Sequence, residues 1–251
     1  MSEFFLELFS EEIPAGLQKN LREKIFEDFK NLFEEKSIRS KKNFSFSTPN
    51  RLVLVFEGLD KQIKIKSKEI RGPKTSAPEQ ALEGFLRSNK INKKDLFKKK
   101  TEKDEFYFYK TVATSLKTHD LLTEFIPKIL SNYQWKKSMK WGEFDLNWGR
   151  PLKSILSIFD KKIVSFKFHH LTSSNLTFLD KDFEEKKRSF ENFKKYEKFF
   201  EDNGVIINQN KRLKIINKSF LKILGKKGLK INENPELMDE DVNLVDNPNV
   251  L

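Results

Sequence analysis

The stretch SMKWGEFDLNWGRPLKSILSIFDKKIVSFKF, residues 138–168, constrains the fold more than any other part of the sequence. It contains two of the three tryptophans, Trp141 and Trp148, each followed by a glycine. A residue without Cβ beside a large ring is typical of backbone that turns sharply against a packed aromatic side chain. We therefore expect a packed loop here.

A β-hairpin is expected directly after this loop. Arg150-Pro151 disfavours helix and starts an extended segment. Residues 154–159 and 162–168 are rich in apolar and β-branched side chains, which predicts two strands. They would be joined at Asp160-Lys161, although Asp-Lys is not a pair that two-residue hairpin turns prefer.

The rest of the chain predicts the α+β class, a mixed or antiparallel sheet with flanking amphipathic helices. Residues 184–203 form one expected helix, and its phenylalanine stripe is expected in the core. The expected division is an α+β module over residues 1–180 and a helical continuation over residues 181–251. Further strands are expected over 4–9, 43–46, 52–57, 62–66 and 105–112, and further helices over 17–36, 81–86, 118–133, 208–225 and 235–245.

Composition excludes several classes of protein. The 251 residues are enough for one large or two small domains, and 25 phenylalanines argue against a disordered chain. Zero cysteines exclude disulfides, thiolate metal sites and a cysteine nucleophile, and are typical of a reducing cytoplasm. No apolar run approaches the roughly 20 residues of a membrane span.

The net charge of +12 has two interpretations. One is an electrostatic surface for nucleic acid. The other is a lysine-rich composition of the kind that AT-rich coding produces. Lys90 to Lys103 is the most basic local run and surrounds a single Phe97. It could contact a nucleic-acid backbone, or it could be a solvated loop.

Candidate reactive groups are few. Glu11 and Glu12 could hold a metal or act as acid and base, but acids at a helix start usually interact with the helix dipole. Arg51 follows a turn at a strand start, where it could contact phosphate or pair with an acid such as Glu12.

The histidines suggest a further possible function, that of a metal-dependent hydrolase. His119-Asp120 matches the dyad of HD-type metal phosphohydrolases, which would need further histidine and aspartate ligands nearby. His169-His170 is interpreted as a polar strand end rather than a proton shuttle. The sequence has no phosphate-binding motif of the P-loop or Rossmann type.

Several short motifs, in order along the chain, resemble the beta subunit of the bacterial two-chain glycyl-tRNA synthetase. They are Glu-Glu-Ile-Pro at 11–14, Thr-Pro-Asn-Arg-Leu at 48–52, Arg-Gly-Pro at 71–73, Met-Lys-Trp-Gly at 139–142 and Arg-Pro at 150–151. Each motif is weak alone, and their common order and spacing carry the resemblance. One family motif, Thr-Arg-Gly-His-Arg-Phe, is not retained, because Ser174, Asn175 and Leu176 stand where its arginine and histidine would be.

The resemblance implies a role in attaching glycine to its tRNA. The alpha subunit would hold the site that activates glycine with ATP, so no cofactor and no catalytic or metal site is expected in this chain. The beta subunit would contribute tRNA recognition and assembly, in the cytoplasm, as two alpha and two beta chains. The resemblance also implies likeness to the tRNA-side domains of the phenylalanyl-tRNA synthetase beta chain, and that the native chain continues beyond Leu251.

Six basic residues are our candidates for facing the tRNA: Arg51, Lys93, Lys94, Lys98, Lys140 and Arg150. Two alternative functions remain at this point. One is a free-standing basic nucleic-acid-binding protein without catalytic activity, and the other is the HD-type hydrolase.

Overall fold

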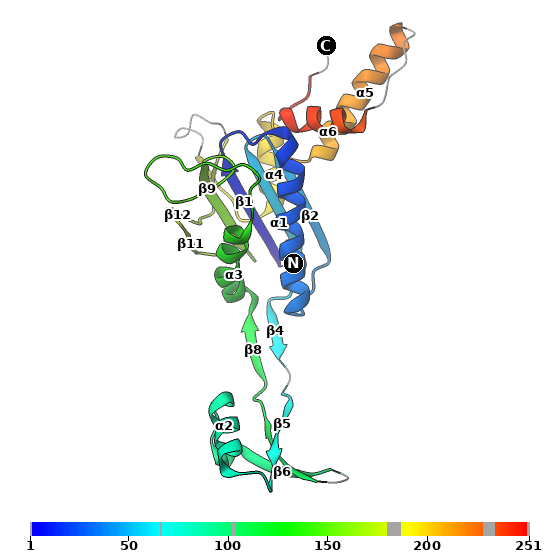
Figure 1. Ribbon diagram of the computed structural model, residues 1–251. Helices are drawn as coiled ribbons and strands as arrows, with labels where there is room; N and C mark the ends of the chain where they lie inside the picture. The colour runs from blue at the N-terminus through cyan, green and yellow to red at the C-terminus, as the bar shows by residue number, and fades with distance from the viewer. Residues whose placement is uncertain (1, 66, 102–103, 180–186, 228–233, 250–251) are drawn as a thin grey trace. The chain divides into compact units, whose positions relative to one another are not determined.

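The computed structural model describes residues 2–65, 67–101, 104–179, 187–227 and 234–249 (Figure 1). The chain forms two compact units: unit 1 is Met1–Lys61 with Lys117–Leu251, and unit 2 is Gln62–Leu116. This division differs from the expected boundary at residue 180. The helices after residue 187 belong to unit 1, because they pack on its sheet.

Unit 1 is built on an antiparallel five-stranded sheet in the order β10-β9-β1-β3-β2. The bounds are β1 Glu3–Ser10, β2 Lys42–Thr48, β3 Arg51–Glu57, β9 Leu152–Phe159 and β10 Lys162–Ile163. The central strand β1 pairs along its length with β3 on one side and β9 on the other. The sheet therefore confirms the strands expected over residues 4–9, 43–46 and 52–57.

One face of this sheet is covered by α1 (Ala15–Glu35), beside which lies α3 (Thr118–Asn132). Phe4 of β1 and Phe56 of β3 meet Phe29 and Phe33 of α1, with ring centroids 5.0–6.4 Å apart. The apolar residues whose spacing predicted helix α1 are thus the residues that α1 buries against the sheet. In the part of the chain that the structure describes, no helix combines the length and apolar character that crossing a bilayer requires.

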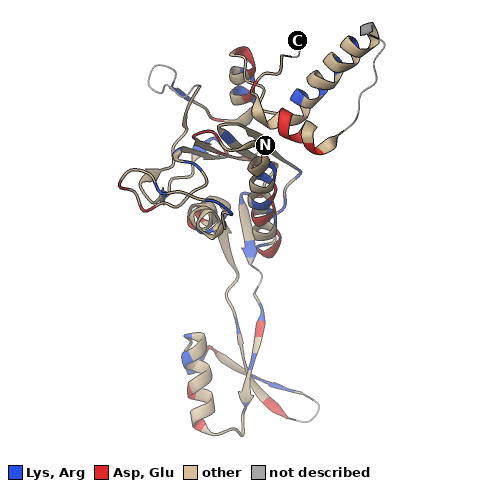
Figure 2. Ribbon diagram, turned by 45° about the horizontal axis from the view of Figure 1, so that its top comes forward, with Lys and Arg blue, Asp and Glu red and all other residues tan. Residues whose placement is uncertain are grey.

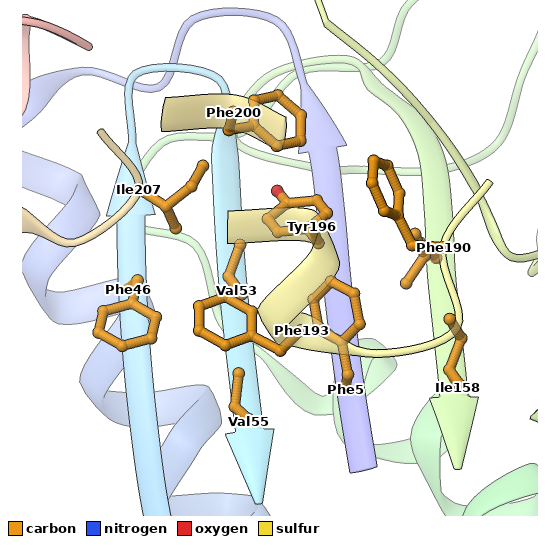
Figure 3. Packing of buried hydrophobic residues seen from close by; sticks show 11 residues of the cluster. Phe5, Phe46, Val53, Val55, Ile158, Phe190, Phe193, Tyr196, Phe200 and Ile207 are labelled. Carbon is orange, nitrogen blue, oxygen red and sulfur yellow. The ribbon is translucent and has the colours of Figure 1, made fainter. Parts of the chain in front are cut away.

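The other face is covered by α4 (Phe193–Asp202), as Figure 3 shows. Phe5 of β1 lies 4.8 Å from the Tyr196 ring and 5.6 Å from the Phe193 ring. Because side chains alternate along a strand, Phe4 and Phe5 face opposite layers. The prediction that the phenylalanine stripe is core is confirmed.

The helix expected over residues 184–203 begins later than its pattern suggested. Asn192 caps it by accepting a hydrogen bond from the Lys195 amide at 2.9 Å. The preceding residues form β14 (Lys187–Ser189), which pairs with β13 (Leu176–Phe178). Residues 184–186 of the expected helix lie outside the described residues. A capping side chain thus set the helix start, although apolar spacing continued before it.

Two further helices, α5 (Gln209–Lys227) and α6 (Pro235–Leu244), are joined to the sheet through Arg212. Its side chain is 0% exposed and donates only to carbonyls, those of Ser47, Ile206, Ile207 and Val242, at 2.6–3.1 Å. Burial lowers the pKa of this guanidinium to about 10. Arg212 therefore connects α5 to β2 and α6.

The expected hairpin is present, with a shorter second strand. Asp160 and Lys161 both have positive φ, 50° and 67°, as a type I′ turn requires. Strand β10 comprises Lys162 and Ile163 alone, and one further hydrogen bond joins the Val164 amide to the Ser157 carbonyl of β9 at 2.9 Å. The strand expected over residues 162–168 is therefore wrong beyond Ile163. The chain then forms β11 (Lys167–Phe168), which pairs instead with β12 (Leu171–Thr172).

The loop before the hairpin, residues 133–150, is here called the tryptophan loop. The Trp135 and Trp148 rings meet edge to face at 4.9 Å, and Trp135 lies directly on Gly149. Gly142 has a positive φ of 57°. The expectation of glycine beside packed rings is confirmed, although the ring on Gly149 is that of Trp135 rather than its neighbour Trp148.

Unit 2 contains a three-stranded antiparallel sheet in the order β5-β7-β6, and β4 pairs with β8. Its one α-helix among the described residues, α2, contacts β5, and the short 3₁₀ helix η1 precedes β6. The bounds are β4 Gln62–Ile65, β5 Glu69–Lys74, α2 Glu79–Asn89, η1 Lys93–Asp95, β6 Leu96–Lys100, β7 Glu105–Lys110 and β8 Thr114–Lys117.

Replacing Gly149 with alanine should lower the free energy of unfolding by about 1–3 kcal/mol, the usual cost of overpacking. A Cβ at Gly149 would overlap the Trp135 ring, whereas a Cβ at Gly16 in α1 would have nothing within 4 Å. Urea denaturation should therefore show a lower midpoint for G149A and an equal or higher midpoint for G16A. Equal midpoints for G149A and the wild type would contradict the packing described.

Candidate nucleic-acid interface

Arg51, one of the six basic candidates, is not on the surface. It is 2% exposed, and its Nε lies 3.5 Å from Oε2 of Glu7, which is itself 0% exposed. Its Nη2 donates to the carbonyls of Phe178 and Leu179 at 2.5 and 2.9 Å. The prediction that Arg51 faces tRNA is wrong, because its guanidinium is occupied inside unit 1. The acid that the structure places beside it is Glu7, not the Glu12 suggested by the sequence.

The surroundings of Glu7 form a buried polar network. The hydroxyls of Thr177 and Tyr196 each donate to one oxygen of its carboxylate. The Arg51 guanidinium also lies between the rings of Phe9 and Phe200, 4.7 and 4.6 Å from their centroids. Burial raises the pKa of Glu7, partly offset by Arg51 and the two hydroxyls. Burial, followed by the Glu7 charge, raises the pKa of Tyr196 well above its usual value, so the phenol stays protonated and donates.

The residues that directly follow Ser174, Asn175 and Leu176 supply partners to this network. Thr177 donates to Glu7, and the carbonyls of Phe178 and Leu179 accept from Arg51. The backbone of Ser174 bonds to Ile155 and Ser157 of β9. The sequence did not predict this role, because the contacts of residues 174–179 are with strands far away along the chain.

Lys140 and Arg150 lie in the tryptophan loop of unit 1. The Lys140 side chain is exposed, with Nζ 3.7 Å from the Asp145 carboxylate, and the half-buried Arg150 donates to the Gly149 carbonyl at 3.0 Å. In the same loop, Phe144 stacks on His170 at 3.7 Å. Burial and the neighbouring His169 lower the pKa of His170.

Lys93, Lys94 and Lys98 lie close together in unit 2, all exposed, the first two in η1 and the third in β6. Over residues 93–100 the basic run is thus a helical turn and a strand rather than a loop, and its residues 102–103 lie outside the described residues. Lys98 Nζ lies 5.9 Å from the Tyr107 ring centroid. Unit 2 has 14 Lys or Arg and 7 Asp or Glu, a net +7 of the chain's +12. The charge is therefore concentrated in this unit, and Figure 2 shows the basic residues of both units.

The acidic and histidine candidates have partners within the protein. Glu11 pairs with Lys153. His119 contacts the Ile163 carbonyl through Nε2 at 3.0 Å and Asp120 through Nδ1 at 3.5 Å. Among the described residues, no three His, Asp or Glu side chains form a cluster that could hold a metal.

Comparison with known proteins identifies the family. The model of the glycyl-tRNA synthetase beta subunit matches residues 4–251. The glycine–tRNA ligase beta subunit of Rickettsia canadensis (strain McKiel) is 37% identical over 251 residues, which cover 100% of this chain and 38% of the relative. That of Rickettsia bellii (strain OSU 85-389) is 38% identical over the same shares.

These matches define the class as a subunit of an aminoacyl-tRNA synthetase. More particularly, the chain belongs to the glycyl-tRNA synthetase beta subunit family. It spans 38% of the length of these curated relatives. The resemblance drawn from the sequence motifs is thereby confirmed.

The raised pKa of Glu7 predicts a specific pH dependence of stability. Between the ordinary value of 4.5 and the raised folded value, the folded state binds more protons than the unfolded state. The free energy of unfolding should therefore fall as pH rises above 4.5, by up to about 1.4 kcal/mol per pH unit. E7Q lacks this titration, so the difference between wild type and E7Q, measured by urea denaturation across this range, should fall with pH. A difference that rises with pH would mean that folding lowers the pKa of Glu7 instead.

Proposed function

We propose that this chain contributes tRNA recognition and subunit assembly to a glycine–tRNA ligase, which attaches glycine to its tRNA at the expense of ATP. Family membership over residues 4–251 carries this proposal. The net charge of +12 and the exposed lysines of unit 2 support a partner with a phosphate backbone.

The remaining parts of the proposal concern the assembled enzyme. A beta subunit implies an alpha subunit, and we propose that the alpha subunit holds glycine and ATP, in a cytoplasmic assembly of two alpha and two beta chains. The antiparallel sheet with flanking helices supports a further likeness, to the tRNA-side domains of the phenylalanyl-tRNA synthetase beta chain. The shared family makes this proposal preferable to a free-standing nucleic-acid-binding protein or a metal hydrolase.

The direct experiment is a charging assay. The alpha chain is supplied with glycine, ATP and tRNA, with or without the beta chain in the length that its gene encodes. We expect glycyl-tRNA only when both chains are present. Equal charging by the alpha chain alone would overturn the proposed function, and stoichiometric metal bound to the purified beta chain would favour the hydrolase instead.

A triple variant with alanine at Lys93, Lys94 and Lys98 should bind tRNA more weakly, and its affinity should depend less on salt. Each lost phosphate contact makes the slope of log affinity against log salt shallower by about 0.9. The slope of the triple variant should therefore be shallower than that of the wild type by about 2–3. Filter binding of tRNA at several salt concentrations gives this slope.

A matched control removes the same charge elsewhere. Lys24, Lys128 and Lys195 are exposed lysines of unit 1, each paired with an acid one helical turn away. Their triple alanine variant should keep the wild-type slope within about one unit. Equal loss of slope in both triple variants would mean that only net charge matters and would remove the three unit 2 lysines as a site.

A further inference from the structure

The two faces of the unit 2 sheet differ in what covers them. Phe85 of α2 meets the Tyr109 ring of β7 at 6.4 Å and lies against Gly72 of β5. Helix α2 therefore packs on the face that carries Tyr109. Because side chains alternate, Phe106 and Phe108 of β7 point to the opposite face.

On that opposite face, basic side chains lie over aromatic rings. Arg71 Cζ is 3.5 Å from the centroid of Phe106, although Arg71 itself is exposed. Phe97 of β6 stacks on Phe108 with centroids 6.0 Å apart and planes at 26°, and it is 37% exposed. The exposed guanidinium of Arg71 thus lies over the buried ring of Phe106, and the exposed ring of Phe97 lies over the buried ring of Phe108. We call the surface formed by Arg71, Lys74, Phe97 and Lys99 the aromatic-basic face.

Two lysines complete this surface. Lys74 Nζ lies 5.9 Å from the Phe106 centroid, and Lys99 Nζ lies 5.7 Å from the Phe108 centroid. They also pair with Asp104 and Glu69, at 2.7 and 2.9 Å, through side chains that are 39–55% exposed. Such exposed pairs are weak in water, so phosphate oxygens can replace the carboxylates.

We propose that the aromatic-basic face binds unpaired nucleotides of RNA, with bases stacked on Arg71 and Phe97 and phosphates held by Lys74 and Lys99. This inference deepens the proposed function, on which it rests, by naming the part of the tRNA partner that unit 2 contacts. Unpaired bases expose the flat surfaces that an aromatic ring or an arginine plane can stack on. The close contact between the Arg71 guanidinium and the Phe106 ring restricts the Arg71 side chain before a base binds.

The chemistry of the face favours this ligand over two others. A helix of another protein would need an open apolar groove, whereas here cationic groups lie over the buried rings. Duplex RNA presents its phosphates and has its bases already stacked, so it would use the lysines but neither platform. The face is also distinct from Lys98, which pairs in register with Tyr107 and points to the α2 side.

The test compares RNA binding by variants of the chain in the length that its gene encodes. The probes are a fluorescent single-stranded oligouridine of about 12 nucleotides and an RNA duplex of equal length, followed by anisotropy at low salt. R71K keeps the charge and removes the plane, and F97L keeps an apolar contact and removes the ring. The control for R71K is R87K, at an exposed arginine of α2. The control for F97L is F44L, because Phe44 is also 37% exposed and also stacks on a ring at 6.0 Å.

We expect R71K and F97L each to weaken binding of the single strand at least about fivefold, while both controls and all duplex affinities stay within about twofold of wild type. Wild-type affinity in both R71K and F97L, or equal losses on the duplex, would overturn the inference, as would no binding of the single strand by wild type. Two independent variants keep the test decisive if thermal unfolding shows that one has not folded.

If charging needs both chains but these variants bind normally, only this inference fails. If charging does not need the beta chain while the variants lose single-strand binding, only the proposed function fails.

Discussion

The fold of unit 1 depends on how one buried carboxylate is compensated. Glu7 lies in the middle of the central strand, where an unpaired charge would be strongly destabilising. Arg51, Thr177 and Tyr196 surround it, and they come from β3, β13 and α4. Segments more than 100 residues apart are thereby required to meet at one point. This requirement explains why Thr177 and Tyr196 pack on a sheet whose central strand begins at Glu3.

The two units divide the properties of the chain between them. Unit 1 has two packed layers on its sheet, and two of its buried arginines, Arg51 and Arg212, donate to backbone carbonyls inside it. Unit 2 lies between β3 and α3 in the sequence and carries a net +7 on 55 residues. Its sheet is small, so the rings of β7 are covered on one face by cationic side chains rather than by a helix. Arg51 and Arg212 are therefore internal supports of unit 1, whereas Arg71, Lys74 and Lys99 are surface groups of unit 2.

The sequence predicted those features that depend on local pattern. Helix α1, strands β1 to β3 and the phenylalanine stripe of α4 follow from apolar spacing, and the type I′ turn at Asp160-Lys161 formed despite an unfavourable pair. Features that depend on distant partners were missed. From sequence alone, Arg51 could not be assigned to the core, because its partner Glu7 lies on another strand. Arg71 was interpreted only as part of an Arg-Gly-Pro turn, because its contact with Phe106 depends on strand register. The three lysines of unit 2 were proposed from charge density alone, whereas the proposal of the aromatic-basic face needed three-dimensional register.

We propose that unit 2 contacts the tRNA and that the buried network around Glu7 supports unit 1 without contacting the tRNA. Hydrogen–deuterium exchange of the chain with and without tRNA for glycine tests this most directly. We expect tRNA to slow exchange in peptides from β5, β6 and β7 and to leave exchange unchanged in β1 and β3 around Glu7 and Arg51. Protection confined to β1 and β3, with no change between Glu69 and Lys110, would contradict it.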